Sequence, residues 1–369
     1  MKKYLTIMVA CMLFACNHKY SNSDVEIIDI NKCFNADQLD IIRTKYINEA
    51  FVVKLETNDN CLLGMGGKFF FSNNKIFIKQ ETIYIFDFDG HFINKLSIGN
   101  GPSEVSNIKA ADFDEEKNEL LVYQEPYIKF YSPDGVFLRE QKIPYYFTSI
   151  KSVKDGYILQ SDAGQMGYKK QSDATFLFVD KDFNIVFPRF DVVKRAAYYD
   201  IENIYHNYEK NITIIPRNND TIYQLINNAL VPIYYIDYSS DKFDNTITNI
   251  NSYFKEMHLH YYWSKYLETS KHQFFSFTKN SNYYVLRDKS NGKLLAGSYY
   301  SINALFSIAA DATYNDYFVS CRNYWDIDNE EYENLSIFSK EDVLKIRNLT
   351  EDDNPLLIFF KLKPFEDEE

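Results

Sequence analysis

The sequence of 369 residues lacks several features that mark particular functional classes. It has 40 basic against 52 acidic side chains, so no excess of positive charge could collect phosphates, and we expect no nucleic-acid partner. None of its five cysteines forms a closely spaced CxxC pair, which leaves out the common zinc and redox motifs. No GxSxG motif occurs, and no Ser/His/Asp grouping can be nominated as a catalytic set. Aromatic residues, by contrast, are abundant: 31 Tyr and 30 Phe favour half-buried strands and hence an all-β fold.

The first residues are typical of a targeting segment. Lys2 and Lys3 precede a mostly apolar run at 4–13, which is too short to span a bilayer, since a spanning helix needs about 20 residues. This pattern predicts a secretory signal peptide. No later stretch of about 18 apolar residues exists, so the rest of the chain is expected to be soluble.

The sequence LFAC that ends in Cys16 resembles the lipobox of bacterial lipoproteins, although Phe14 is bulkier than usual at its position. The resemblance implies that residues 1–15 are a lipoprotein signal peptide and that Cys16 carries lipid. Several acyl chains would then hold the protein on a membrane. The alternative is an ordinary signal peptide followed by a chance cysteine. Residues 16–50 are expected to be a lipidated tether and an irregular lead-in.

Three cysteines, Cys33, Cys61 and Cys321, remain in the body of the chain. At most one disulfide could form, and the sequence does not choose the pair. We expect free thiols.

A repeat runs through the rest of the chain. The segments 82–93 (TIYIFDFDGHFI) and 127–138 (YIKFYSPDGVFL) each place an Asp-Gly pair between two apolar strands, and the two pairs lie 45 residues apart. Glycine tolerates the positive φ that a tight hairpin turn needs, so each segment predicts a β-hairpin. Degraded copies follow at 175–187, 221–236 and 282–298.

Each hairpin is preceded by a short apolar strand, and the strands together give six units with a period of about 45 residues. The preceding strands are 75–80, 119–124, 156–161, 211–216, 272–277 and 316–321. A period of 40–50 residues with about four strands a unit predicts a β-propeller. We therefore expect a six-bladed β-propeller over residues 51–369. The strand at 51–56 is expected to pair with the strand at 356–362 and close the ring.

The best-kept unit, residues 99–138, resembles the NHL-type propeller repeat in its Gly-x-Gly-Pro-x-Glu start and its FYSPDG hairpin. It departs from that repeat at Gln124, where Asp is usual. The whole layout is similar to the six-bladed β-propeller lipoproteins of Bacteroidota, on the segments 98–104, 266–277 and 351–363.

Two pieces fall outside the repeat. In 245–267, apolar residues recur at steps of three and four, which predicts a helix inserted between blades 4 and 5. Ser339 and the acids that follow it resemble a capping box and predict a short helix at about 340–347, near the C-terminus.

The candidate metal ligands are few. His258 and His260 lie two positions apart, so on a helix they would point away from each other, and no third histidine is nearby. Gluconolactonase-type propellers hold a divalent cation at the channel with Asp and Asn residues, but turn chemistry accounts for most of those residues in this chain. We expect no metal and no cofactor. The paired acids at 112–116 are expected to form a solvated face.

The candidate ligand site is aromatic. The chain has two tryptophans, Trp263 and Trp325, with Tyr262 and Arg322 close to them in sequence. Exposed aromatic rings with polar neighbours suit sugar rings or peptides, so these four residues are predicted to form a ligand surface at one mouth of the channel. The alternative is that the rings pack the inserted helix on the blades.

The predicted function is a non-catalytic binding or scaffold module for a glycan, a peptide or a partner protein, touching the membrane only through its lipid. The resemblance implies an outer-membrane lipoprotein. A periplasm-facing anchor is favoured over the cell surface, because residues 17–19 lack the acids that tend to follow the lipidated cysteine in surface-exported members of this group. The alternative is a propeller enzyme, either a metal-dependent lactonase or a polysaccharide hydrolase or lyase. Converging Asp, Glu, Asn or His side chains in the channel would favour that alternative.

Overall fold

A computed structural model describes most of the chain after residue 24. The described residues are 25–31, 33, 46–64, 66–161, 174–191, 204–206, 211–215, 220–227, 229–237, 250–257, 262–278, 282–298, 310–327 and 337–365. The predicted signal peptide and the predicted lipidation site Cys16 lie outside them.

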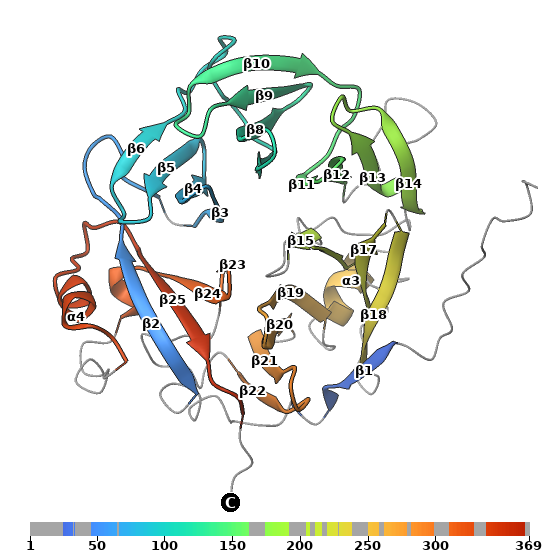
Figure 1. Ribbon diagram of the computed structural model, residues 1–369, viewed down its shortest axis with the longest axis vertical. Coiled ribbons are helices and arrows are strands. Elements are labelled where there is room, and N and C mark those ends of the chain that lie inside the picture. The colour runs from blue at the N-terminus through green and yellow to red at the C-terminus, as the bar shows by residue number, and fades with distance from the viewer. Residues whose placement is uncertain are drawn as a thin grey trace, which may run out of the picture.

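The described strands form six sheets arranged in a ring (Figure 1). Each sheet contains four antiparallel strands that follow one another from the inside of the ring to its rim, and one sheet carries a fifth strand. The fold is therefore the six-bladed β-propeller predicted from the repeat. We number the blades 1 to 6 from the first repeat unit.

Blades 1 to 3 are continuous in sequence. From the inner to the outer strand, blade 1 comprises β3 (Lys68–Ser72), β4 (Lys75–Lys79), β5 (Ile83–Asp87) and β6 (Phe92–Lys95). Blade 2 comprises β7 (Ala110–Asp114), β8 (Glu119–Gln124), β9 (Tyr127–Tyr131) and β10 (Phe137–Lys142). Blade 3 comprises β11 (Ser149–Val153), β12 (Gly156–Gln160), β13 (Ala174–Asp180) and β14 (Ile185–Asp191).

Blades 4 to 6 include both ends of the described chain. Blade 4 comprises β15 (Ile204–His206), β16 (Ile212–Ile214), β17 (Thr221–Ile226), β18 (Ala229–Asp237) and β1 (Glu26–Asp29). Blade 5 comprises β19 (Tyr262–Glu268), β20 (His272–Thr278), β21 (Asn282–Asp288) and β22 (Leu294–Ser298). Blade 6 comprises β23 (Ala312–Tyr314), β24 (Tyr317–Arg322), β25 (Leu356–Leu362) and β2 (Ile47–Lys54).

The core lies between the blades. The buried apolar side chains of the described residues fall into six clusters, and each cluster joins two neighbouring blades. Strand β25 shows how one sequence serves two of them. Leu356, Ile358 and Phe360 face blade 5, whereas Leu357 and Phe359 face blade 1. This two-residue alternation follows from strand geometry and accounts for the abundance of large apolar and aromatic residues.

The ring is closed by strands from opposite ends of the chain. Strand β2 pairs antiparallel with β25, from Ile47 opposite Leu362 to Lys54 opposite Leu356. The Phe51 ring stacks on that of Phe359, with centroids 4.7 Å apart. The closing strand starts at Ile47, four residues before the predicted segment 51–56.

Helix α4 (Lys340–Arg347) covers the outer edge of the closing strand. Its N-cap is Ser339, as predicted from the sequence, and the Ser339 hydroxyl accepts a hydrogen bond from the Asp342 amide. The Asp342 carboxylate accepts the Val52 N–H at 3.2 Å, and Lys345 donates to the Val52 carbonyl at 3.3 Å. The N–H and carbonyl groups of Val52, which a strand of another molecule could otherwise pair with, are thus hydrogen-bonded within the chain.

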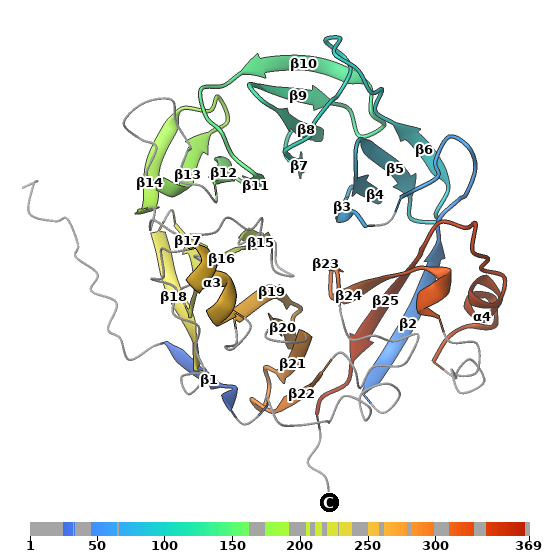
Figure 2. The same cartoon turned by 180° about the vertical axis from the view of Figure 1, so that it is seen from behind.

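The helix between blades 4 and 5 exists but is shorter than predicted. Helix α3 spans Ile250–Met257, and from Tyr262 the chain forms the inner strand of blade 5 (Figure 2). Tyr262 lies opposite Thr278, so the second half of the predicted helical segment pairs with β20 instead. The helical periodicity was misleading there because blade 5 otherwise lacks a fourth strand, and the aromatic-rich sequence suits a strand.

The lead-in at 16–50 is not irregular throughout. Strand β1 pairs parallel with β18, with Glu26 opposite Tyr234 and Asp29 opposite Asp237. Ile28 and Ile30 are buried between blades 4 and 5. The Glu26 carboxylate pairs with Arg287 of blade 5, so this segment joins two blades.

The predicted acidic face at 112–116 is wrong for its first two carboxylates. Asp112 is buried and Asp114 has no exposed surface. Asp114 accepts hydrogen bonds from the Tyr157 hydroxyl at 3.0 Å and from the Lys181 ammonium at 2.7 Å, both on blade 3. Burial opposes ionisation of Asp114, but the bonds from Lys181, the Lys117 amide and Tyr157 outweigh burial and hold its pKa below the usual value.

The three cysteines of the propeller are free thiols, as expected. Burial, with a smaller contribution from Asp29, raises the pKa of Cys33 to about 11.

Helix α4 should stabilise the closed ring. We expect Asp342→Ala to lower the free energy of unfolding by about 1–3 kcal/mol, because it leaves the Val52 N–H unpaired and removes part of the helix cap. The matched control is Asp352→Ala, an exposed acid, which should change stability by less than about 0.5 kcal/mol. Urea unfolding would measure both values, and equal values would contradict the covering role.

The Asp114 cluster should make stability depend on pH. Because the pKa of Asp114 is lowered in the folded state, the ionised carboxylate stabilises the fold fully above the unfolded-state pKa of about 3.9. This stabilisation is lost as the pH falls through the lower folded-state pKa. Asp114→Asn should therefore cost about 1–3 kcal/mol at pH 7, and the difference from the parent should shrink below about pH 4. Asp182→Asn, on an exposed turn of blade 3, serves as the control in the same urea titrations. A difference that stays constant from pH 7 to pH 3 would argue against an ionised Asp114.

Candidate functional site

One face of the propeller carries its largest connections. We call it the linker face: it holds the linkers that enter each inner strand and the connections between the second and third strands of each blade. The connection in blade 6 runs from β24 to β25 and contains both a 3₁₀ helix, η6 (Tyr324–Asp326), and helix α4. Loops held on a rigid scaffold are common places for binding groups.

Trp325 is presented outward from this face. Its side chain is 74% exposed. The residues on both sides hold it in place, because Tyr324 packs against the core between blades 5 and 6 and Ile327 is buried in that core. The Asp326 carboxylate accepts bonds from the Asn323 amide at 2.9 Å and the Asn323 side chain at 3.1 Å, which fixes the short helix. The Tyr324 and Trp325 rings meet edge to face at 5.2 Å.

The other predicted ligand residues reach the same face. Tyr262 and Trp263 begin the inner strand of blade 5, at the end where the linker enters it. Arg322 ends β24 of blade 6, but it is only 8% exposed, and its guanidinium donates to the Cys321 carbonyl. The topology therefore brings all four residues to the linker face of two adjacent blades, with Trp325 outward and Arg322 largely covered.

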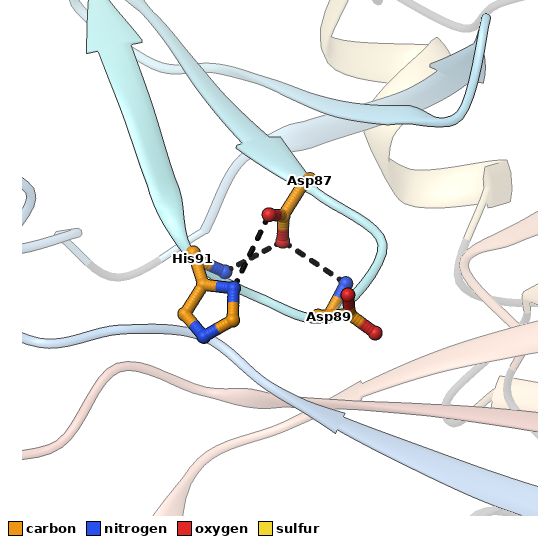
Figure 3. A group of neighbouring side chains, drawn as sticks. All are labelled: Asp87, Asp89 and His91. Atoms are coloured by element: carbon orange, nitrogen blue, oxygen red, sulfur yellow. Dashed lines mark hydrogen bonds and ion pairs between the residues drawn. The ribbon is translucent and has the colours of Figure 1, made fainter.

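The carboxylates near the inner strands join blades to one another. Asp112 of blade 2 accepts the Ser152 amide of blade 3 at 2.6 Å. Lys265 of blade 5 pairs with Asp311 of blade 6 at 3.3 Å. Within the part of the chain that the structure describes, the one group of three close metal-ligand side chains is Asp87, Asp89 and His91, at the turn between β5 and β6 (Figure 3). No such group of described residues lies on an inner strand.

The hydrogen bonds of this group account for its geometry. The Asp87 carboxylate accepts the Asp89 and His91 amides at 3.0 and 2.8 Å and lies 3.2 Å from His91 Nδ1. Blade 3 repeats the arrangement, with Asp180 bound by the amide and the side chain of Asn184. Since an asparagine takes the place of His91, these side chains shape the outer hairpin of a blade.

The same turn also contacts the neighbouring blade. A Cβ on Gly90, whose φ is +90°, would lie 2.1 Å from the Lys54 carbonyl oxygen. The Glu56 amide donates to the Gly90 carbonyl at 2.8 Å. Glycine is needed here for the positive φ and for the close approach to the end of β2.

The glycine-rich segment 99–102 is a blade-connecting loop. Its Gly101 carbonyl accepts the Lys129 ammonium at 3.0 Å, and its Gly101 amide donates to the Glu104 carboxylate at 2.8 Å. Lys129 also donates to the Glu104 carbonyl. The polar groups of this loop are thus used within the fold.

The linker face also contains a cavity of about 650 Å³ over blade 1. The cavity could not be recognised in the sequence, because it forms only where the loop at 62–67 lies beside the β4–β5 turn. Its lining residues are Leu62, Gly64, Gly66, Gly67, Gln80, Glu81 and Tyr84. Burial, followed by the charges of Glu81 and Cys61, raises the pKa of Tyr84, so its hydroxyl is a neutral donor at pH 7.

A known structure shares this fold. A Bacteroides fragilis NCTC 9343 protein whose name describes it as exported is 21% identical, with a TM-score of 0.74 over 91% of this chain and 99% of that chain. A Bacteroides caccae protein of unknown function (11% identity, TM-score 0.38, covering 67% of this chain and 93% of that one) is a weaker match. The virginiamycin B lyase of Staphylococcus aureus is also a weaker match, with 10% identity and a TM-score of 0.40 over 73% of this chain and 81% of that chain. Those two TM-scores carry no argument about this chain.

No curated protein matches the sequence. A family model does match, over residues 25–361, and its description is "Domain of unknown function (DUF4934)". Those residues include all twenty-five strands of the described parts of the chain, except the last residue of β25. The chain therefore belongs to the DUF4934 family.

Proposed function

We propose that this chain is a lipid-anchored cell-envelope propeller that binds a glycan, a peptide or a partner protein without catalysing a reaction. The observation that carries the proposal is the exposure of Trp325 between two anchored neighbours. A large exposed apolar ring on a monomeric surface marks an interaction site when the fold holds it there rather than burying it.

The proposed surface includes the other ligand residues predicted from the sequence. Tyr262 and Trp263 start the inner strand of blade 5, next to the blade that carries Trp325. Arg322 ends β24, directly before the connection that carries Trp325. In the proposal the ligand contacts the tryptophan rings, and the polar groups around them set its orientation.

The envelope location draws on three observations. The LFAC segment ends in Cys16. Among the described helices there is none of the length and apolarity that a membrane span requires. The similar Bacteroides fragilis protein is described by its name as exported. We propose an outer-membrane lipoprotein that faces the periplasm, because Asn17, His18 and Lys19 supply no acidic signal after the cysteine.

Lipidation should depend on one residue. We expect Cys16→Ala to abolish acylation, because the thioether lipid requires the Cys16 sulfur, and to move the protein from the detergent phase to the aqueous phase in phase partitioning. Cys61→Ala, which changes a buried thiol in the propeller, is the control and should leave partitioning unchanged. Detergent-phase partitioning of the Cys16→Ala chain would overturn the anchor.

Trp325 should matter for binding and not for folding. We expect Trp325→Ala to weaken ligand binding roughly tenfold or more, since an aromatic platform contributes ~1–3 kcal/mol by analogy with base stacking. Its thermal midpoint should stay unchanged, because the ring is 74% exposed. Binding is measured by screening immobilised glycans and peptides and titrating the ligands found. A variant that binds every ligand as the parent does would refute the platform.

A further inference from the structure

The cavity over blade 1 has walls held by two different blades. Asn354, at the end of the blade 6 connection, accepts the Leu63 amide at 2.8 Å and donates to the Cys61 carbonyl at 2.8 Å. On the other side the Gln80 side chain accepts the Gly64 amide at 3.0 Å and donates to the Gly64 carbonyl at 2.8 Å. The loop is therefore fixed at both flanks, so a ligand would not have to order it on binding.

The β4–β5 turn of blade 1, which lines the cavity, is also held by hydrogen bonds. The Gln80 amide donates to the Thr82 carbonyl at 2.8 Å, which closes the turn, and the Thr82 hydroxyl donates to the Leu96 carbonyl at 2.7 Å. Glu81 lies between them at the tip, with its side chain exposed. Its carboxylate is thus offered to the cavity by a rigid turn.

The glycines leave the loop backbone open. An added Cβ on Gly66 would have no atom within 4 Å, so space for a ligand adjoins this residue. Its φ of +76° is one that side-chain-bearing residues rarely adopt. Leu62, 58% exposed, supplies the apolar part of the lining.

The charges at the cavity are few. Glu81 is the ionisable acid of the lining and would repel a carboxylate, a sulfate or a phosphate. The Lys95 ammonium, outside the lining, lies 5.8 Å from the centre of the Tyr84 ring, and its charge offsets part of the attraction that Glu81 would exert on a cation. A neutral ligand rich in hydroxyl groups can donate hydrogen bonds to Glu81 without bringing a second charge to the site.

The geometry points to a subsite for a neutral saccharide in this cavity. We propose that Glu81 accepts hydroxyl hydrogen bonds, that Leu62 packs against the apolar face of a sugar ring, and that the open backbone at Gly66 lets the ring approach closely. The volume of about 650 Å³ falls within the ~300–1,000 Å³ range of small-molecule sites. The inference rests on the proposed binding function and deepens it, because it selects glycans among the proposed partners.

The test uses the purified full chain without its signal peptide on an array of neutral, sialylated and sulfated glycans, followed by calorimetric titration of the glycans that bind. We expect neutral oligosaccharides to bind. Glu81→Gln should weaken that binding roughly tenfold, the effect of losing one charge-assisted hydrogen bond, and Leu62→Ser should weaken it severalfold. The matched controls are Glu140→Gln and Leu138→Ser, on the exposed outer strand of blade 2, and both should bind as the parent does.

The outcomes separate this inference from the proposed function. Binding that is lost in Trp325→Ala but unchanged in Glu81→Gln and Leu62→Ser would overturn the cavity and leave the proposed function standing. A preference for sialylated or sulfated glycans would also overturn it. An array without any bound glycan, together with a peptide that binds through Trp325, would reject the saccharide and keep the binding module.

Discussion

The antiparallel pairing of β2 with β25 is the contact on which the rest of the propeller depends. Each blade buries its two faces against its neighbours, so a gap in the ring would expose apolar surface on two blades at once. The pairing joins residues about 300 positions apart in sequence, and the chain therefore completes the core between blades 5 and 6 only when both ends are in place. Helix α4, which covers β2, protects the edge that this arrangement leaves.

Much of the fold could be predicted because local sequence determines it. The Asp-Gly turns at Gly90 and Gly135 need positive φ, and their spacing gave the number of blades. Ser339 marked the start of α4 because a helix cap is a short-range interaction. The features that could not be predicted depend on distant partners. Residues 26–29 form a strand because they pair with β18. Asp114 can be buried because Lys181 and Tyr157 of the next blade donate hydrogen bonds to its carboxylate.

The candidate site shows the same division. Trp325 could be nominated from composition alone, since tryptophan is rare in this chain, but its exposure depends on how Tyr324 and Ile327 are buried. The segment 245–267 was predicted as one helix, but helix α3 ends at Met257 and pairing with β20 makes the residues from Tyr262 a strand. The cavity over blade 1 could not be found by reading the sequence, because it forms only where the loop before β3, with Leu62, lies beside the β4–β5 turn, with Glu81.

Under the proposed lipidation at Cys16, strand β1 would also determine how far the rim of blade 4 can move from a membrane. If the chain is anchored at Cys16, only the nine residues 17–25 lie between the lipid and Glu26, whereas the thirty residues 17–46 would lie between the lipid and β2 without this strand. Nine residues extend at most ~30 Å. The rim of blade 4 would then stay within about that distance of the bilayer, whereas blade 1, across the ring from blade 4, could lie farther from it.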